Sequence, residues 1–73
     1  MTNTIKKQVW LCMDGVHQHA YNILQVMSDK TLLVQPEGAE TTYWLYLRYP
    51  YGVLENEKTH EIKRGYITSP FYV

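Results

Sequence analysis

The residues of this chain with the greatest potential for chemistry are its one cysteine, Cys12, and its three histidines, His17, His19 and His60. A cysteine beside a histidine can act as a nucleophile with its base, and two histidines two residues apart share one face of a strand and could grip a metal ion. No catalytic motif accompanies Cys12, and the histidine pair would need a third ligand from Cys12 or His60. We therefore expect Cys12 to be a small buried side chain, and we predict no enzymatic activity, no metal and no cofactor.

A different chemistry, recognition by aromatic and arginine side chains, is concentrated in residues 43–51. Four of the seven tyrosines and one of the two tryptophans lie there, in the run Tyr43-Trp44-Leu45-Tyr46-Leu47-Arg48-Tyr49-Pro50-Tyr51. Because successive residues of a strand point to opposite faces, Trp44, Tyr46 and Arg48 would share one side. That side is typical of a protein-binding surface, but it could also stack nucleic-acid bases, or close a small core with Arg48 in solvent. Which side is buried stays open at this point.

Two clusters near the C-terminus could extend such a surface. Lys63-Arg64 beside Tyr66 is the other group of basic and aromatic residues, although two adjacent cations often form a solvated stretch. Ser69-Pro70-Phe71-Tyr72 is a candidate linear interaction segment, with an edge strand as the alternative. The predicted partner-binding residues are Trp44, Tyr46, Arg48, Tyr51, Lys63, Arg64, Tyr66, Phe71 and Tyr72.

Composition limits the class of protein. The 73 residues predict a single domain, and seven basic side chains balance seven acidic ones. A dedicated nucleic-acid binder usually carries a basic excess, so zero net charge disfavours that class without excluding a local patch. One cysteine cannot form an internal disulfide, no apolar run reaches the roughly 20 residues that span a bilayer, and the start does not have the pattern of a signal peptide. We expect a cytoplasmic protein that does not enter the membrane.

The elements that would position these residues are mostly strands. Residues 5–13 predict a first strand, and Asp14-Gly15 predicts a tight type I′ turn. Residues 16–28 fit either a helix at about 15–28 or a strand. The strand interpretation is favoured because a hairpin around residues 28–30 would place Val26 opposite Leu33 and Met27 opposite Leu32.

Further along, Pro36-Glu37-Gly38 predicts a loop before the aromatic strand, and Val53-Leu54 predicts a last short strand. Residues 55–64 are polar and predict a loop or a short helical turn. Residues 65–73 predict either a final edge strand or a peptide tail, so that the termini, 1–4 and 65–73, could be flexible. The predicted fold class is therefore mainly β, a small antiparallel sheet or barrel of four or five strands, with an α+β fold as the alternative.

The order of these elements resembles an SH3-like or Tudor-like barrel. The resemblance covers roughly residues 9–54: a Trp-containing strand, an Asp-Gly turn, a hairpin, a Pro-Glu-Gly loop and an aromatic strand. It carries no diagnostic motif, so it concerns the fold alone. Barrels of this kind generally bind peptides, modified side chains, nucleic acid or protein partners rather than catalyse reactions.

The whole chain also resembles small phage-encoded transcription regulators, in its size, its tyrosine content and the runs Thr4-Ile5-Lys6-Lys7-Gln8-Val9-Trp10 and Tyr43 to Tyr51. The resemblance implies a protein that binds the bacterial RNA polymerase of the host near its RNA exit region, blocks initiation by displacing the sigma factor and promotes antitermination. No functional residue transfers from it, because no motif aligns. The expected function is protein binding with polymerase as the suggested partner; the alternative is a small nucleic-acid-binding β domain that uses its aromatic and arginine face.

Overall fold

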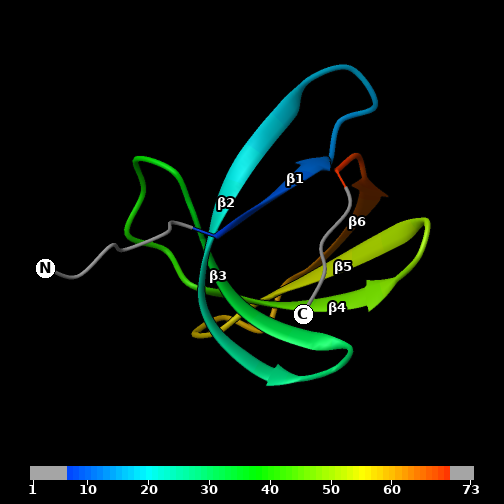
Figure 1. The fold of residues 1–73 in the computed structure, drawn as a ribbon. Helices are drawn as coiled ribbons and strands as arrows, with labels where there is room; N and C mark the ends of the chain where they lie inside the picture. Colours follow the sequence, from blue (N-terminus) through cyan, green and yellow to red (C-terminus); the bar gives the residue numbers. More distant parts are fainter. Residues whose placement is uncertain (1–6, 70–73) are drawn as a thin grey trace, which may run out of the picture.

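Residues 8–67 form a closed barrel of six antiparallel strands in a computed structural model that describes residues 7–69 (Figure 1). Each strand pairs with the next along the chain, and β1 closes the barrel against β6. The strands are β1 (Gln8–Cys12), β2 (Gln18–Ser28), β3 (Thr31–Pro36), β4 (Tyr43–Arg48), β5 (Tyr51–Asn56) and β6 (Ile62–Ile67). The mainly β prediction is confirmed, with six strands where four or five were expected.

The core lies inside the barrel and is almost entirely aliphatic. Its buried residues come from all strands except β6: Val9, Leu11, Tyr21, Leu32, Val34, Leu45, Leu47 and Leu54. Six strands enclose a narrow interior, and Leu and Val fill such a space without a polar atom that would need a partner. The alternation of buried and half-buried positions along β3 and β4 is the sequence pattern that builds this interior.

Residues 18–28 form strand β2, so the alternative helix at about 15–28 is wrong. The expected hairpin is present, with Ser28 opposite Thr31, but the predicted register is not. Val26 pairs with Leu32, and Gln25 pairs with Leu33. Irregularities between Ile23 and Gln25 and between Val26 and Ser28 shift the ladder. A bulge inserts an unpaired residue and breaks the period of two, which explains why β2 resembles a helix in sequence.

The connection between β1 and β2 is longer than the predicted two-residue turn. Cys12 pairs with Gln18, so residues 13–17 all lie in the connection. The Asp14 carboxylate accepts hydrogen bonds from the backbone N–H groups of Val16 and His17, both at 2.8 Å, and Gly15 adopts a φ of 79°. The Asp-Gly pair therefore makes a turn, but the side chain of Asp14 organises a wider loop than a type I′ hairpin.

Much of the segment 55–64, predicted as a loop or helical turn, belongs to strands. Asn56 ends β5, and β6 begins at Ile62 after a short turn in which the Asn56 side chain accepts hydrogen bonds from the N–H groups of Lys58 and Thr59. His60 completes this turn with a φ of 65°. The expected short strand at Val53-Leu54 is the centre of the longer β5. Charged and polar residues can occupy these strands because β5 is only partly covered on its outward side and the consecutive residues Ile62, Lys63 and Arg64 of β6 are all exposed.

The closure between β1 and β6 is short and tight. Leu11 pairs with Ile67 and Cys12 with Tyr66, and an added Cβ at Gly65 would lie 2.6 Å from the carbonyl oxygen of Cys12. Beyond β6, the N–H of Thr68 donates to the carbonyl of Trp10 at 2.9 Å. Residues 65–67 are therefore strand, whereas residues 1–4 and 70–73, whose flexibility was predicted, lie outside the described residues. No helix in the described part of the chain is long and apolar enough to cross a membrane.

Candidate functional site: an aromatic–arginine face

The outward side of β4, β5 and β6 brings together most of the predicted binding residues. Directly opposite residues of antiparallel strands point to the same side, and the register forms three outward rows across these strands. One row is Tyr46, Val53 and Arg64, the next is Arg48, Tyr51 and Tyr66, and the third is Trp44, Glu55 and Ile62. We call seven of these residues the aromatic–arginine face: Trp44, Tyr46, Arg48, Tyr51, Val53, Arg64 and Tyr66.

The structure shows which side of the run 43–51 is buried. Leu45 and Leu47 point inward and are buried, whereas Trp44 and Tyr46 lie outward and are partly covered by neighbouring side chains. Tyr49, which strand alternation would place on the same side as Leu45 and Leu47, lies in the turn before β5 and is exposed. The interpretation that Trp44 and Tyr46 close the core is wrong, because the aliphatic residues already fill it.

Arg48 and Arg64 line one shallow hollow of about 460 Å³ with Tyr51 and Val53. Arg48 comes from the end of β4, Arg64 from the middle of β6, and the two β5 residues lie between them. We call this feature the arginine hollow. Two guanidinium groups on either side of a tyrosine and a valine combine charge, hydrogen-bond donors and an apolar base in one place.

Beside the hollow, Tyr51 and Tyr66 form an exposed aromatic pair. Their ring centroids are 5.1 Å apart and their planes are tilted by 37°, within the range of favourable aromatic contacts. Tyr51 is 44% exposed and Tyr66 51% exposed. Large aromatic side chains that remain this exposed while holding each other in place are suited to contact with a partner.

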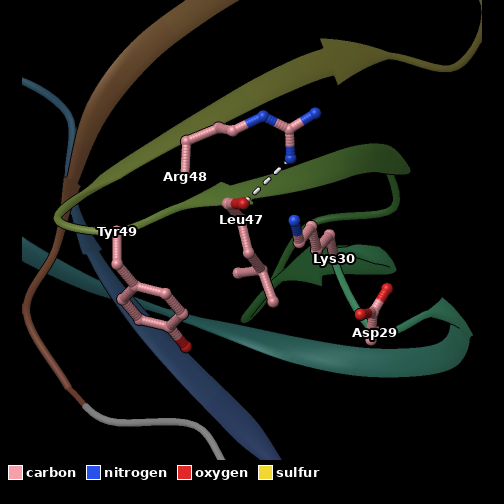
Figure 2. A pocket seen from close by; sticks show the side chains of 5 residues that line it. All are labelled: Asp29, Lys30, Leu47, Arg48 and Tyr49. Carbon is pink, nitrogen blue, oxygen red and sulfur yellow. Dashed lines mark hydrogen bonds between the residues drawn. The ribbon is translucent and has the colours of Figure 1, made fainter.

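A second hollow lies at the same end of the barrel, where the β2–β3 and β4–β5 turns approach each other. Asp29, Lys30, Leu47, Arg48 and Tyr49 line its volume of about 400 Å³. Figure 2 shows the guanidinium of Arg48 above Leu47, to whose carbonyl it donates a hydrogen bond of 2.9 Å, with Lys30 nearby. Arg48 therefore contributes to both hollows, and Lys30 adds a third cation to this end of the molecule.

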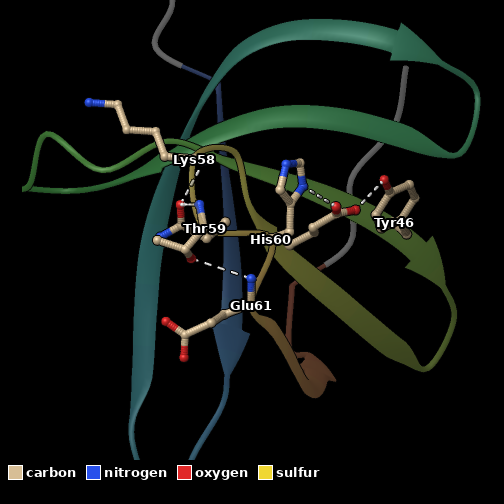
Figure 3. A network of polar contacts seen from close by, with 7 residues as sticks. Tyr46, Lys58, Thr59, His60 and Glu61 are labelled. Carbon is tan, nitrogen blue, oxygen red and sulfur yellow. Dashed lines mark hydrogen bonds and ion pairs between the residues drawn. The ribbon is translucent and has the colours of Figure 1, made fainter.

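The other end of the face holds a polar network centred on Glu55. The hydroxyl of Tyr46 donates to one carboxylate oxygen at 2.8 Å, and Nδ1 of His60 lies 2.9 Å from the other (Figure 3). The contacts from His60 and then from Tyr46 hold the pKa of Glu55 below its ordinary value, because both favour the charged carboxylate. The bond to Glu55 in turn raises the pKa of Tyr46. Each oxygen of this carboxylate therefore has one partner within the protein.

The remaining predicted binding residues are not brought to this face. Lys63 is exposed but leaves β6 on the side opposite Arg64, because it pairs with the buried Leu54. Phe71 and Tyr72 lie outside the described residues. Val53, Glu55 and His60 were missed by sequence reasoning, although the alternation Tyr51-x-Val53-x-Glu55 is a strand signal that continues the exposed side past Tyr51.

The cysteine and histidines do not converge. Cys12 is partly rather than fully buried, and His17 and His19 lie with ring centroids 6.5 Å apart. Nδ1 of His17 is instead 3.1 Å from a carboxylate oxygen of Asp14. Among residues 7–69, no three Cys, His, Asp or Glu side chains are grouped so as to hold a metal ion.

Comparisons with known proteins do not identify a relative of this chain. A scan against protein-family models finds no match, and searches of curated proteins and of solved structures find no significant match. The function must therefore be inferred from the residues of the face themselves.

Proposed function

We propose that this protein is a non-enzymatic regulator that acts by binding a larger protein through its aromatic–arginine face. The observation that carries the proposal is the exposed outward side of β4–β6, where tyrosine, tryptophan and arginine gather in register. These three residue types dominate the energetics of protein–protein contacts because they combine large apolar area with directed polar groups. The arginine hollow and the Tyr51–Tyr66 pair would be the centre of the contact.

The suggested partner is bacterial RNA polymerase, with inhibition of initiation and promotion of antitermination as the outcome. The support is the resemblance to small phage-encoded transcription regulators in the runs 4–10 and 43–51. The second of these runs supplies β4 and the start of β5, and so part of the proposed surface. Such a partner implies the bacterial cytoplasm as the site of action.

The direct test is binding of the purified protein to purified bacterial RNA polymerases from several genera, as core enzyme and as holoenzyme, followed by transcription from a promoter and through a terminator. We expect binding, reduced initiation and increased readthrough with at least one polymerase. Arg64→Glu should weaken binding at least tenfold, because it replaces a cation of the proposed contact surface with an anion.

Lys58→Glu is the matched control. It changes the net charge equally, but Lys58 lies in the exposed turn between β5 and β6, away from the arginine hollow. Its binding should stay within twofold of the wild type. Failure to bind any polymerase tested would refute the polymerase proposal.

Single-stranded nucleic acid is the second candidate, favoured by one observation. The exposed Tyr51–Tyr66 pair lies beside two arginines, and stacked aromatic rings with nearby cations are the elements of a single-strand binding site. Salt titration of binding to a generic oligonucleotide tests it. A steep fall of log K with log salt, lost in Arg64→Glu, would support this candidate over a pure protein binder.

A further inference from the structure

The arginine hollow contains more positive charge than the protein itself neutralises. Among residues 7–69, the ion pairs join His17 to Asp14 and His60 to Glu55, and no carboxylate pairs with Arg48 or Arg64. Within the described residues, the Arg48 side chain donates one hydrogen bond, to the neutral carbonyl of Leu47, which uses one of its five donors. Most guanidinium donors at the hollow therefore remain available to a ligand.

The acidic residue in the cross-strand rows of β4–β6 is Glu55, which pairs with His60 and with neither arginine in the described structure. Glu55 lies on β5, in the row of Trp44 beyond Val53, but its two oxygens already accept from Tyr46 and meet His60. Moving it toward the arginines would break both contacts. In the cross-strand rows of β4–β6 the acidic residue is Glu55, and its contacts with Tyr46 and His60 keep it from pairing with the arginines. The hollow therefore remains available to an external anion.

The lining of the hollow distinguishes among possible anions. Carboxylates match the planar fork of arginine, and the ring of Tyr51 and the side chain of Val53 offer apolar contact to the methylene groups of an aspartate or glutamate. A long polyanion would need a continuous basic track, but Asp29 lies at the cationic end of the face and Glu55 lies at its other end. The charge pattern fits a short acidic segment better than a nucleic-acid strand.

We propose that the arginine hollow binds an aspartate or glutamate of the partner, so that the face selects an exposed acidic segment of polypeptide. This inference rests on the proposed function in that the hollow lies at the centre of the proposed contact surface. It adds the chemistry of the partner: carboxylates held by Arg48 and Arg64, with neighbouring apolar side chains against the Tyr51–Tyr66 pair.

The probe is a ten-residue peptide of aspartate and glutamate with one central phenylalanine, tested against its neutral counterpart with asparagine and glutamine and against a ten-nucleotide oligo(dT). Binding is followed by fluorescence anisotropy of the labelled probe and by NMR titration of the ¹⁵N-labelled protein, including the Nε–H signals of arginine. We expect the acidic peptide to shift the signals of Tyr51, Val53 and Arg64 and to bind at least tenfold more tightly than the neutral peptide.

Arg48→Gln and Arg64→Gln should each weaken peptide binding about tenfold, and Lys58→Gln should leave it within twofold. Circular dichroism and a thermal melt of each variant show that it is folded. The inference is overturned if the acidic peptide does not bind, if neither arginine variant weakens binding, or if oligo(dT) binds more tightly through the same arginines.

The same variants separate this inference from the proposed function. If polymerase binds and both arginine variants bind it as the wild type does, the proposed function stands and the acidic-segment inference fails. If the peptide binds in an arginine-dependent way but no polymerase binds, the polymerase proposal fails and the assignment of the hollow to acidic segments stands.

Discussion

Three buried leucines of β4 and β5 dominate the inward side of strands β4–β6, whereas the outward side of the same strands carries most of their aromatic and basic residues. Leu45, Leu47 and Leu54 lie inside and are at most 6% exposed. The outward positions are Trp44, Tyr46, Arg48, Tyr51, Val53, Glu55, Ile62, Arg64 and Tyr66. Alternate residues of these strands therefore have different roles. Those on the inward side stabilise the barrel, and those on the outward side are available for contact.

The physical reason lies in the size of the barrel. A six-stranded barrel of this length encloses a narrow space, which leucine and valine fill without leaving a hydroxyl or indole N–H unpaired. Tyrosine is better accommodated outside, where its ring covers neighbouring side chains and its hydroxyl reaches water or a partner such as Glu55. The difference teaches that an aromatic-rich strand in a very small barrel is not evidence of an aromatic core.

The largest effect is expected from truncation of the inward side. Leu45→Ala should lower the free energy of unfolding by about 3 kcal/mol, because it removes a fully buried side chain and leaves a cavity. For a domain of this size that is a large part of roughly 4–10 kcal/mol of stability. Chemical denaturation monitored by tryptophan fluorescence measures it. Val53→Ala, on the outward side of the adjacent strand, is the control and should cost less than half as much.

A smaller effect is expected from Trp44→Ala on the outward side. Trp44 pairs with Leu33 on β3 and with Glu55 on β5, and it is partly buried between them. Its loss should lower the free energy of unfolding by about 2 kcal/mol, in proportion to the apolar area that it covers. Unfolding should stay cooperative. A variant with no folded state at room temperature would contradict the assignment of Trp44 to the contact side.

The fold was predictable in class but not in detail. The β-branched and aromatic runs and the turn residues predict strands, and the small size predicts a barrel or bent sheet. The register of β2 was not predictable, because its bulges near Leu24 and Met27 depend on how the long hairpin curves around the core. The start of β6 was hidden for another reason: Lys63 and Arg64 make it polar on both sides, so it lacks the apolar alternation of a half-buried strand.

The sequence predicted most residues of the candidate site, but it did not predict that they lie together on one face. The sequence indicates Arg48, Tyr51, Arg64 and Tyr66 as separate candidates, but they meet only because β5 and β6 pair in one register. A register shift of one residue would turn Arg64 inward and Lys63 outward. The partner of Glu55 was also beyond sequence reasoning, since His60 reaches it only through the left-handed turn before β6.

Acid sensitivity provides a smaller test of the polar network on the outward side. Because the pKa of Glu55 is lower in the folded protein than its ordinary 4.5, its contribution to stability is present above that value and is lost as the pH falls through the folded-state pKa. Glu55→Gln should therefore lower the melting temperature at neutral pH, and its difference from the wild type should shrink at pH values below about 4. Thermal melts across this pH range measure the difference.

Asp14 must be controlled in the same experiment. Hydrogen bonds from the backbone N–H groups of His17 and Val16 lower its pKa as well, so it loses stabilisation in the same acidic range. The effect of Glu55 is best measured in the background of Asp14→Asn. An identical pH dependence of Glu55→Gln and its parent would show that the Tyr46 and His60 contacts do not persist in solution.

The smallest effect on stability is expected at the arginines, and this is where the contrast between the two sides is sharpest. Arg48 and Arg64 are exposed and pair with no carboxylate of the described chain, so Arg48→Gln and Arg64→Gln should each change the free energy of unfolding by less than about 0.5 kcal/mol. The same substitutions should weaken binding to the acidic peptide about tenfold, whereas Leu45→Ala should weaken it only in proportion to the unfolded fraction. If the arginine variants lost stability and binding together, the arginines would be part of the scaffold, and the division of β4–β6 into a stabilising side and a contacting side would be wrong.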